Sequence, residues 1–169
     1  MKVTFIAREY PPNIYGGAGV HLRELARCLA GMIEVDVRCF GEQESQKNNL
    51  RVKGYAPDPP LHCQDQPKFD SVFNTLFTDL LILMDRIDAD VVHTHTWYAH
   101  LAGLLARQLY NTPYVATSHS LEPLRPWKKD QLAEGYYLSS WIEKTGLESA
   151  DRVVAVSQMM KEDILKYFD

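Results

Sequence analysis

The sequence has few cysteines, no excess of positive charge and no apolar run that approaches the length of a membrane span. Its three cysteines are an odd number without metal-type spacing, which excludes a disulfide framework and indicates reduced thiols in a cytosol. The net charge is -4, and the basic residues are scattered except for Lys128 and Lys129. We therefore expect a cytoplasmic protein without nucleic-acid or membrane partners.

What the chain does contain is enough for one globular domain. It has 169 residues, of which 46% are hydrophobic and 11% aromatic. A chain of this length buries a sizeable core, and this composition excludes disorder. We expect residues 1–169 to form one domain, without repeats or an internal linker.

Short β-branched segments alternate with amphipathic ones along the chain. Six segments are expected as strands: residues 2–7, 33–40, 50–56, 89–95, 112–119 and 151–157. Helices are expected between them, whereas the polar stretch "GEQESQKNN" before the third strand is expected as a connection. Such alternation favours a parallel sheet, because each crossover helix returns the chain to the same end. The prediction is an α/β, Rossmann-like doubly wound sheet in the order 3-2-1-4-5-6, with helices on both faces.

Three unusual segments follow strands one, four and five of this sheet. They are "REYPPNIYGGAGVH", "HTHTWY" and "SHSLEPLRPWK". Ligands bind such sheets outside the carboxyl ends of the strands, where the strand order reverses. The three segments are therefore expected to converge on a binding site.

The glycine-rich segment allows two interpretations. Gly16, Gly17 and Gly19 precede a helix N-terminus, where free N–H groups favour an anion. Their spacing matches neither the dinucleotide pattern GxGxxG nor a P-loop. The segment is either a plain turn between strand and helix or a place where the backbone comes very close to a ligand. In both cases the two prolines are expected to hold it extended.

The histidines suggest hydrogen bonding rather than metal binding. His93 and His95 point to the same face of their strand, and His93 is expected as a core residue. His95, at the end of the strand, is expected to meet a ligand, and His119 ends the next strand. No carboxylate or further histidine at ligand spacing accompanies them, so we expect no metal site and no cofactor.

Other polar and aromatic residues have ordinary interpretations beside functional ones. Trp97, Tyr98 and Trp127 offer ring faces on which sugars stack, whereas Trp141 is expected in the core. Ser157 is expected to cap the last helix. Two further residues are expected as a surface ion pair: Glu143 and Lys144.

Four stretches in order along the chain resemble one enzyme family. They are "REYPPNIYGGAGVHLREL", "DVVHTHTWYAHLAG", "SHSLEPLRPWK" and "SSWIEKTGLESADRVVAVS". The chain resembles, over its whole length, the N-terminal domain of retaining glycosyltransferases of the GT-B architecture. Among these it is most similar to bacterial glycogen synthases of the actinobacterial type.

The resemblance implies roles for particular residues. Gly16 and Gly17 would approach the donor sugar and its diphosphate, and His95 would line the catalytic centre. The remaining residues would shape the acceptor cleft: Tyr15, Trp97, His119, Glu122, Arg125, Trp127 and Lys128. In one respect the chain departs from the pattern. Many relatives carry a lysine two positions before the paired glycines, where this chain has Ile14.

The implied reaction transfers glucose from ADP-glucose, or from another nucleotide-glucose such as UDP-glucose, to an α-1,4-glucan with retention. The resemblance places the nucleotide-sugar half in a C-terminal domain that lies outside residues 1–169. We therefore expect the isolated chain to be inactive.

Several alternatives remain open. The acceptor could be glucose 1-phosphate, which would give maltose 1-phosphate, or another small sugar. A lipid-linked acceptor, an epimerase of nucleotide sugars and a non-enzymatic glucan-binding module are the others.

Overall fold

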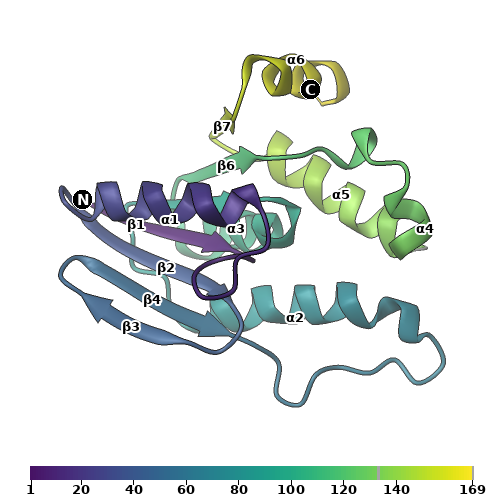
Figure 1. The fold of residues 1–169 in the computed structure, drawn as a ribbon, viewed down its shortest axis with the longest axis horizontal. Coiled ribbons are helices and arrows are strands. Elements are labelled where there is room, and N and C mark those ends of the chain that lie inside the picture. Colours follow the sequence, from purple (N-terminus) through teal and green to yellow (C-terminus); the bar gives the residue numbers. More distant parts are fainter. Residues whose placement is uncertain (133, 169) are drawn as a thin grey trace.

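A computed structural model describes residues 1–132 and 134–168. One sheet of seven strands runs through the molecule in the order β3-β4-β2-β1-β5-β6-β7 (Figure 1). The strands are β1 (Lys2–Ala7), β2 (Glu34–Phe40), β3 (Glu44–Lys47), β4 (Leu50–Tyr55), β5 (Val91–His95), β6 (Tyr114–Ser118) and β7 (Arg152–Ala155). The helices are α1 (Gly17–Leu29), α2 (Asp70–Met84), α3 (Trp97–Tyr110), α4 (Lys128–Leu132), α5 (Gly135–Glu148) and α6 (Gln158–Tyr167). Two 3₁₀ turns, η1 (Pro67–Phe69) and η2 (Glu122–Leu124), complete the described elements.

The predicted parallel sheet and its strand order are confirmed. The six expected strands correspond to β1, β2, β4, β5, β6 and β7, which pair in parallel in the predicted order. Ala133, the first residue of the segment expected to hold the fourth helix, and Asp169, the end of the expected domain, lie outside the described residues.

The polar connection expected before the third strand is wrong in part, because it contains β3. This strand pairs antiparallel with β4 at the edge of the sheet, and all its residues are exposed. Asn48, with a φ of 51°, makes the turn between the two strands. A strand that buries no side chain carries no hydrophobic alternation, so the pattern gave no sign of it.

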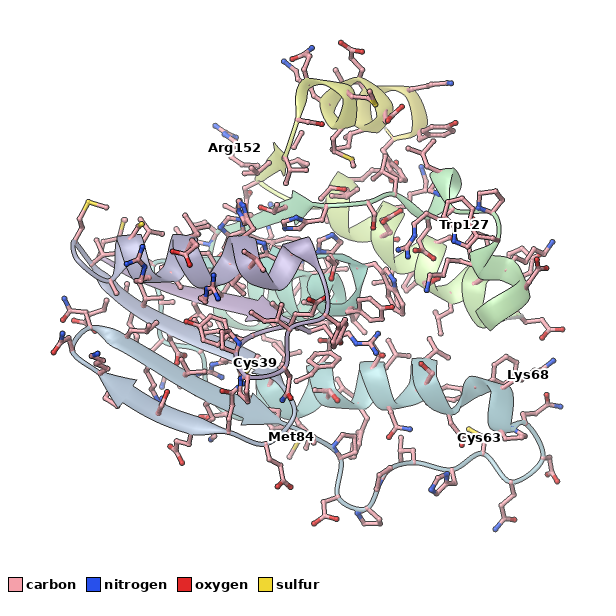
Figure 2. The ribbon with its side chains drawn as sticks, viewed as in Figure 1. Cys39, Cys63, Lys68, Met84, Trp127 and Arg152 are labelled. Carbon is pink, nitrogen blue, oxygen red and sulfur yellow. The ribbon has the colours of Figure 1, made fainter. Side chains whose placement is uncertain are left out.

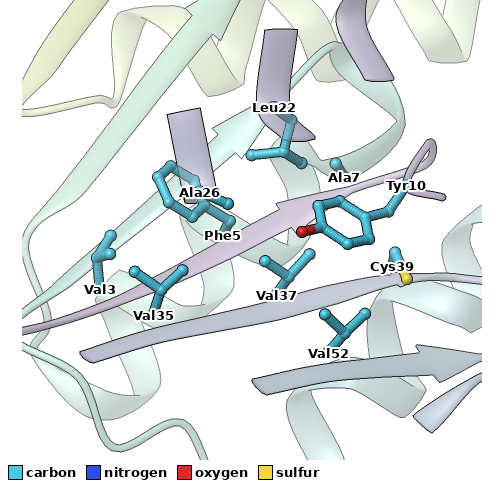
Figure 3. Packing of buried hydrophobic residues seen from close by; sticks show 10 residues of the cluster. All are labelled: Val3, Phe5, Ala7, Tyr10, Leu22, Ala26, Val35, Val37, Cys39 and Val52. Carbon is cyan, nitrogen blue, oxygen red and sulfur yellow. The ribbon is translucent and has the colours of Figure 1, made fainter. Parts of the chain in front are cut away.

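The core lies on both faces of the sheet. On one face, Leu22 and Ala26 of α1 pack on Phe5 and Val37 of β1 and β2 (Figure 3). On the other face, Ile6, the next residue after Phe5, packs within a second cluster that includes residues of α2 and α3. This alternation is the period-two pattern of a strand covered on both sides.

Three smaller expectations have different outcomes. Ser157 caps α6 as expected, since its hydroxyl accepts a hydrogen bond from the Met160 amide at 3.1 Å. Trp141 is 55% exposed, so its expected place in the core is wrong. Glu143 is only 2% exposed and therefore does not form the expected surface pair; Lys144 pairs with Glu148 instead.

The three cysteines are free thiols. Among the described residues, no helix has the length and hydrophobicity needed to cross a bilayer.

Candidate functional site

The carboxyl ends of three parallel strands lie level with one another. Ala7 of β1 pairs with His95 of β5, and His95 pairs with Thr117 of β6. A cleft of about 560 Å³ opens at this edge, lined by residues from all three following segments. The predicted convergence of these segments is therefore present in the structure.

Most of the residues singled out from the sequence lie on the walls of this cleft. Seven of them line it: Tyr15, Gly16, Gly17, Trp97, His119, Arg125 and Lys128. The other three lie elsewhere. His95 and Glu122 are each only 1% exposed, beneath the surface, and Trp127 is 54% exposed on the segment between β6 and α4 (Figure 2).

A carboxylate that the sequence analysis did not single out orders the glycine-rich segment. Glu9 Oε2 accepts hydrogen bonds from the amide of Tyr15 at 3.2 Å and from that of Gly16 at 2.8 Å. The expectation that the two prolines hold the segment extended is wrong. The chain turns there, and the Asn13 amide donates a hydrogen bond to the Tyr10 carbonyl at 2.8 Å. The position of Glu9, two residues beyond the first strand, is the signal that could have identified it.

The glycines of this segment serve two different purposes. A Cβ on Gly19 would lie 2.9 Å from Glu9 Cβ and 3.0 Å from Ile14 Cγ1, so this glycine permits close packing. A Cβ on Gly17 would meet no atom within 4 Å. Gly17 is exposed at the start of α1 and lines the cleft, so neither packing nor backbone geometry explains its lack of a side chain.

Two histidines meet at the floor of the cleft. His95 Nδ1 lies 3.0 Å from His119 Nε2, so one ring donates a hydrogen bond to the other. Burial lowers the pKa of His119 to about 4 and holds the pKa of His95 well below its usual range. Both rings are thus neutral at pH 7, which suits hydrogen bonding to sugar hydroxyls rather than charge pairing.

His95 reaches the cleft through His119. Its other nitrogen, Nε2, is buried and has no hydrogen-bond partner among the described residues. His93, on the same face of β5, bonds instead to the Thr117 hydroxyl at 2.6 Å. His93 thus occupies the satisfied internal position that was predicted for it.

One group of side chains in the described ranges has the geometry to hold a metal ion. His21, on α1, joins His95 and His119, and one nitrogen of each lies within 4.8 Å of the others. His21 is exposed and sits one turn inside the helix. His21 was not identified from the sequence because its position relative to the other two histidines depends on how α1 packs.

The backbone is strained where β5 meets α3. Thr96 has a φ of 66°, in the left-handed region, and it lines the cleft. A β-branched residue in this region is rare, and such strain concentrates at functional sites. No sequence pattern reveals a dihedral angle of this kind.

The segment after β6 brings cations to the cleft and buries carboxylates behind them. Arg125 and Lys128 line the cleft, and Arg125 Nη1 lies 3.7 Å from Glu122 Oε1. Glu122 is held by the Ser139 hydroxyl at 2.9 Å, and its amide donates to Glu143 at 2.7 Å. Burial raises the pKa of Glu143 to about 8, so this carboxyl is protonated at pH 7.

Aromatic rings flank the cleft. Trp97 is buried and stacks on Tyr98, with ring centroids 4.1 Å apart, and both residues line the cleft. Tyr15, which also lines the cleft, is 66% exposed. The Arg8 guanidinium lies over the Tyr98 ring at 4.2 Å and over the Tyr15 ring at 5.5 Å.

Comparison with known proteins finds similar enzymes. The chain is 46% identical over 168 residues to an α-maltose-1-phosphate synthase of Mycolicibacterium smegmatis, covering 99% of this chain and 41% of that protein. A glycogen synthase of Mycobacterium tuberculosis is 23% identical over 190 residues, covering 99% of this chain and 45% of that protein. The chain thus spans less than half the length of these relatives.

Solved structures show the same fold. Sucrose-phosphate synthase from Thermosynechococcus elongatus superposes with a TM-score of 0.72 at 18% identity, over 99% of this chain and 45% of that one. The sequence profile of Glycosyltransferase Family 4 matches residues 15–169, which include all the residues that line the cleft except Glu9. The chain belongs to glycosyltransferase family 4.

Proposed function

We propose that the protein containing this chain transfers a glucosyl group from a nucleotide-glucose to glucose 1-phosphate, forming maltose 1-phosphate. The observation that carries this proposal is the 46% identity to an α-maltose-1-phosphate synthase. The prediction of a glycogen synthase is not confirmed, because the identity to such an enzyme is only 23%. Of the two acceptors considered from the sequence, the comparison favours the sugar phosphate.

In this proposal Gly16 and Gly17 lie beside the diphosphate of the donor. Gly16 is the N-cap of α1 and the first turn carries no acidic residue; the Glu9 carboxylate takes the Gly16 amide and leaves the amides from Gly17 onward. A helix N-terminus of this kind stabilises the negative charge that develops on the leaving diphosphate. The absent side chain at Gly17 allows the ligand to come close to the backbone.

His119 faces the reacting sugars, and His95 holds its ring in place. Since His119 is neutral, it orients a hydroxyl by a hydrogen bond and leaves the charge of the diphosphate to other groups. The transfer proceeds with retention at the anomeric carbon, and no metal or other cofactor is required.

We also propose that the nucleotide is bound by a second domain outside this chain. The comparison supports this division, because residues 1–169 align with less than half of each relative. The isolated chain then folds around its own core but does not turn over ADP-glucose. Turnover by the isolated chain would contradict this division of labour.

The proposed function is tested by identifying the product. The full-length protein is incubated with ADP-glucose, or in parallel with UDP-glucose, and offered either glucose 1-phosphate or a maltooligosaccharide. We expect a product with the mass of maltose 1-phosphate. A lengthened glucan as the only product would overturn the proposal, and so would nucleotide release without any new glucoside.

A further inference from the structure

One side of the cleft carries three cations, of which only Arg125 has a carboxylate within 4.0 Å among the described residues, the buried Glu122. Arg125 and Lys128 line it, and Arg8 lies at its margin over two aromatic rings. Neither Arg8 nor Lys128 has a carboxylate within 4.0 Å in the described part of the chain. Burial, together with the charges of Arg125 and Arg8, lowers the pKa of Lys128, so the three cations repel one another in the free protein.

The two carboxylates near these cations are already engaged. Glu9 lines the cleft, but its Oε2 accepts from two backbone amides of the glycine-rich segment. Glu122 stands close to Arg125, yet it is fully buried. Of the three cations only Arg125 is paired with a carboxylate among the described residues, so the positive charge of Arg8 and Lys128 is available to a ligand.

Arg125 is held in place rather than free on the surface. Its Nη1 donates to the Ser120 hydroxyl at 3.3 Å and lies 3.7 Å from Glu122 Oε1. Glu122 is in turn fixed by Ser139 Oγ at 2.9 Å, and its carbonyl accepts from the Tyr136 hydroxyl at 2.8 Å. A guanidinium has five N–H donors, so this anchoring leaves others to bind a phosphate.

We infer that Arg125 and Lys128, with Arg8 beside them, form the subsite for the phosphate of a sugar-phosphate acceptor. The inference rests on the proposed function, and it names the groups that select an anionic acceptor. A neutral glucan has no charge to meet three crowded cations, whereas the dianion of a phosphate monoester relieves their repulsion. Charge-assisted hydrogen bonds to phosphate are among the strongest that side chains make.

The donor also carries phosphates, but a different part of the cleft suits them. Glu9 accepts from the Gly16 amide, so the N-terminus of α1 offers backbone N–H groups from Gly17 onward, and Arg125 and Lys128 come from the separate segment after β6. Kinetics distinguishes the two phosphate sources, because each substrate has its own KM.

The experiment compares Arg125→Gln and Lys128→Met in the full-length protein. The KM for glucose 1-phosphate is measured at saturating ADP-glucose, and the KM for ADP-glucose at saturating glucose 1-phosphate. Each variant is expected to raise the first KM roughly 10- to 100-fold and to leave the second within about twofold.

A matched control stands next to the subsite. Lys129 is exposed, and its amine lies 5.2 Å from the Tyr137 ring centroid. Lys129→Met removes the same charge one residue further along, and both KM values are expected to stay unchanged. Since Lys128 has no ion pair with a described residue, Lys128→Met tests the inference even where Arg125→Gln unfolds the protein.

The outcomes separate the two proposals. A wild-type protein that forms no maltose 1-phosphate refutes the proposed function and the inference with it. A wild-type protein that forms it, with unchanged KM values in Lys128→Met and Arg125→Gln, refutes the inference alone. A rise in the KM for ADP-glucose instead assigns these cations to the donor and overturns the inference as well.

Discussion

One wall of the cleft is made of backbone, and another is made of charged side chains on a buried support. Where β1 leads into α1, Gly16 and Gly17 present no side chains to the cleft, and a hydrogen bond to Glu9 fixes the path of the backbone. After β6, Arg125 and Lys128 face the cleft, and Arg125 rests on buried Glu122. In our proposal the first wall controls how closely a ligand approaches, and the second controls which charge the ligand carries. Steric and electrostatic selection are therefore separable by mutation.

The largest expected effect is on the backbone wall. Gly17→Val places a branched side chain where a Cβ meets no protein atom within 4 Å, so folding is unaffected. Because the new side chain occupies the space of the ligand, kcat of the full-length protein should fall about 100-fold. Initial rates and a thermal unfolding curve measure the two effects.

Gly19→Ala is the contrasting variant on the same wall. Its Cβ lies 2.9 Å from Glu9 Cβ, and overpacking of this kind costs about 1–3 kcal/mol of unfolding free energy. If Gly17→Val lowers stability while turnover per folded molecule is retained, Gly17 belongs to the turn alone.

A smaller effect is expected at the floor between the walls. His119→Ala removes a hydrogen bond to the sugars, which lowers kcat roughly tenfold, and leaves buried His95 Nδ1 without its partner. His119→Gln keeps an amide for His95 and should restore stability without restoring kcat. Equal kcat values in both variants and in the wild type would remove His119 from the site.

The pH dependence of stability distinguishes the buried histidines from Glu143, which lies behind the charged wall. Burial lowers the pKa of His93 and His119 to about 4 and of His100 to about 3, so between pH 4 and 6.5 the unfolded chain binds more protons and stability rises with pH. Burial raises the pKa of Glu143 from 4.5 to about 8, so its contribution falls as pH rises through that range. Stability should peak near pH 6.5 and fall by up to about 2 kcal/mol towards pH 8.

Urea unfolding of the protein across this range measures the profile. Glu143→Gln keeps a neutral group of the same size and should reduce the decline above pH 6.5; any remaining decline is due to Asp79, whose pKa burial also raises. If the stability of the wild-type protein does not decline above pH 6.5, Glu143 is already ionised in the folded protein. The buried carboxylates behind Arg125 would then differ from those described.

The smallest effect is expected from metal removal. His95 and His119 already bond to each other through one nitrogen each, so we expect the proposed reaction to need no ion, and EDTA should leave kcat unchanged. Activity that EDTA abolishes and a divalent cation restores would assign a metal to His21, His95 and His119.

The parts predictable from sequence were those set by local pattern. Buried strands such as β1 are predicted by their apolar runs, and the alternation with helices predicts the parallel order. The edge strand β3 has no apolar run, because every one of its side chains is exposed, and it was not predicted. The convergence of three segments followed from topology alone, since parallel strands end at one edge.

The parts that sequence could not predict depend on contacts between distant segments. A glutamate on a helix, such as Glu143, is normally expected at the surface. It is buried here and accepts a hydrogen bond from the amide of Glu122, 21 residues away in the chain. His21 joins the other histidines only because α1 packs over β1. The strain at Thr96 is a property of the backbone between two elements.

The most direct test of the account is a competition between acceptors. The full-length protein is given ADP-glucose together with equal concentrations of glucose 1-phosphate and a maltooligosaccharide, and the products are counted by mass. The account predicts that maltose 1-phosphate predominates in the wild type, and that this preference is lost in Lys128→Met and kept in Lys129→Met. Preferential lengthening of the maltooligosaccharide by the wild-type protein would contradict it.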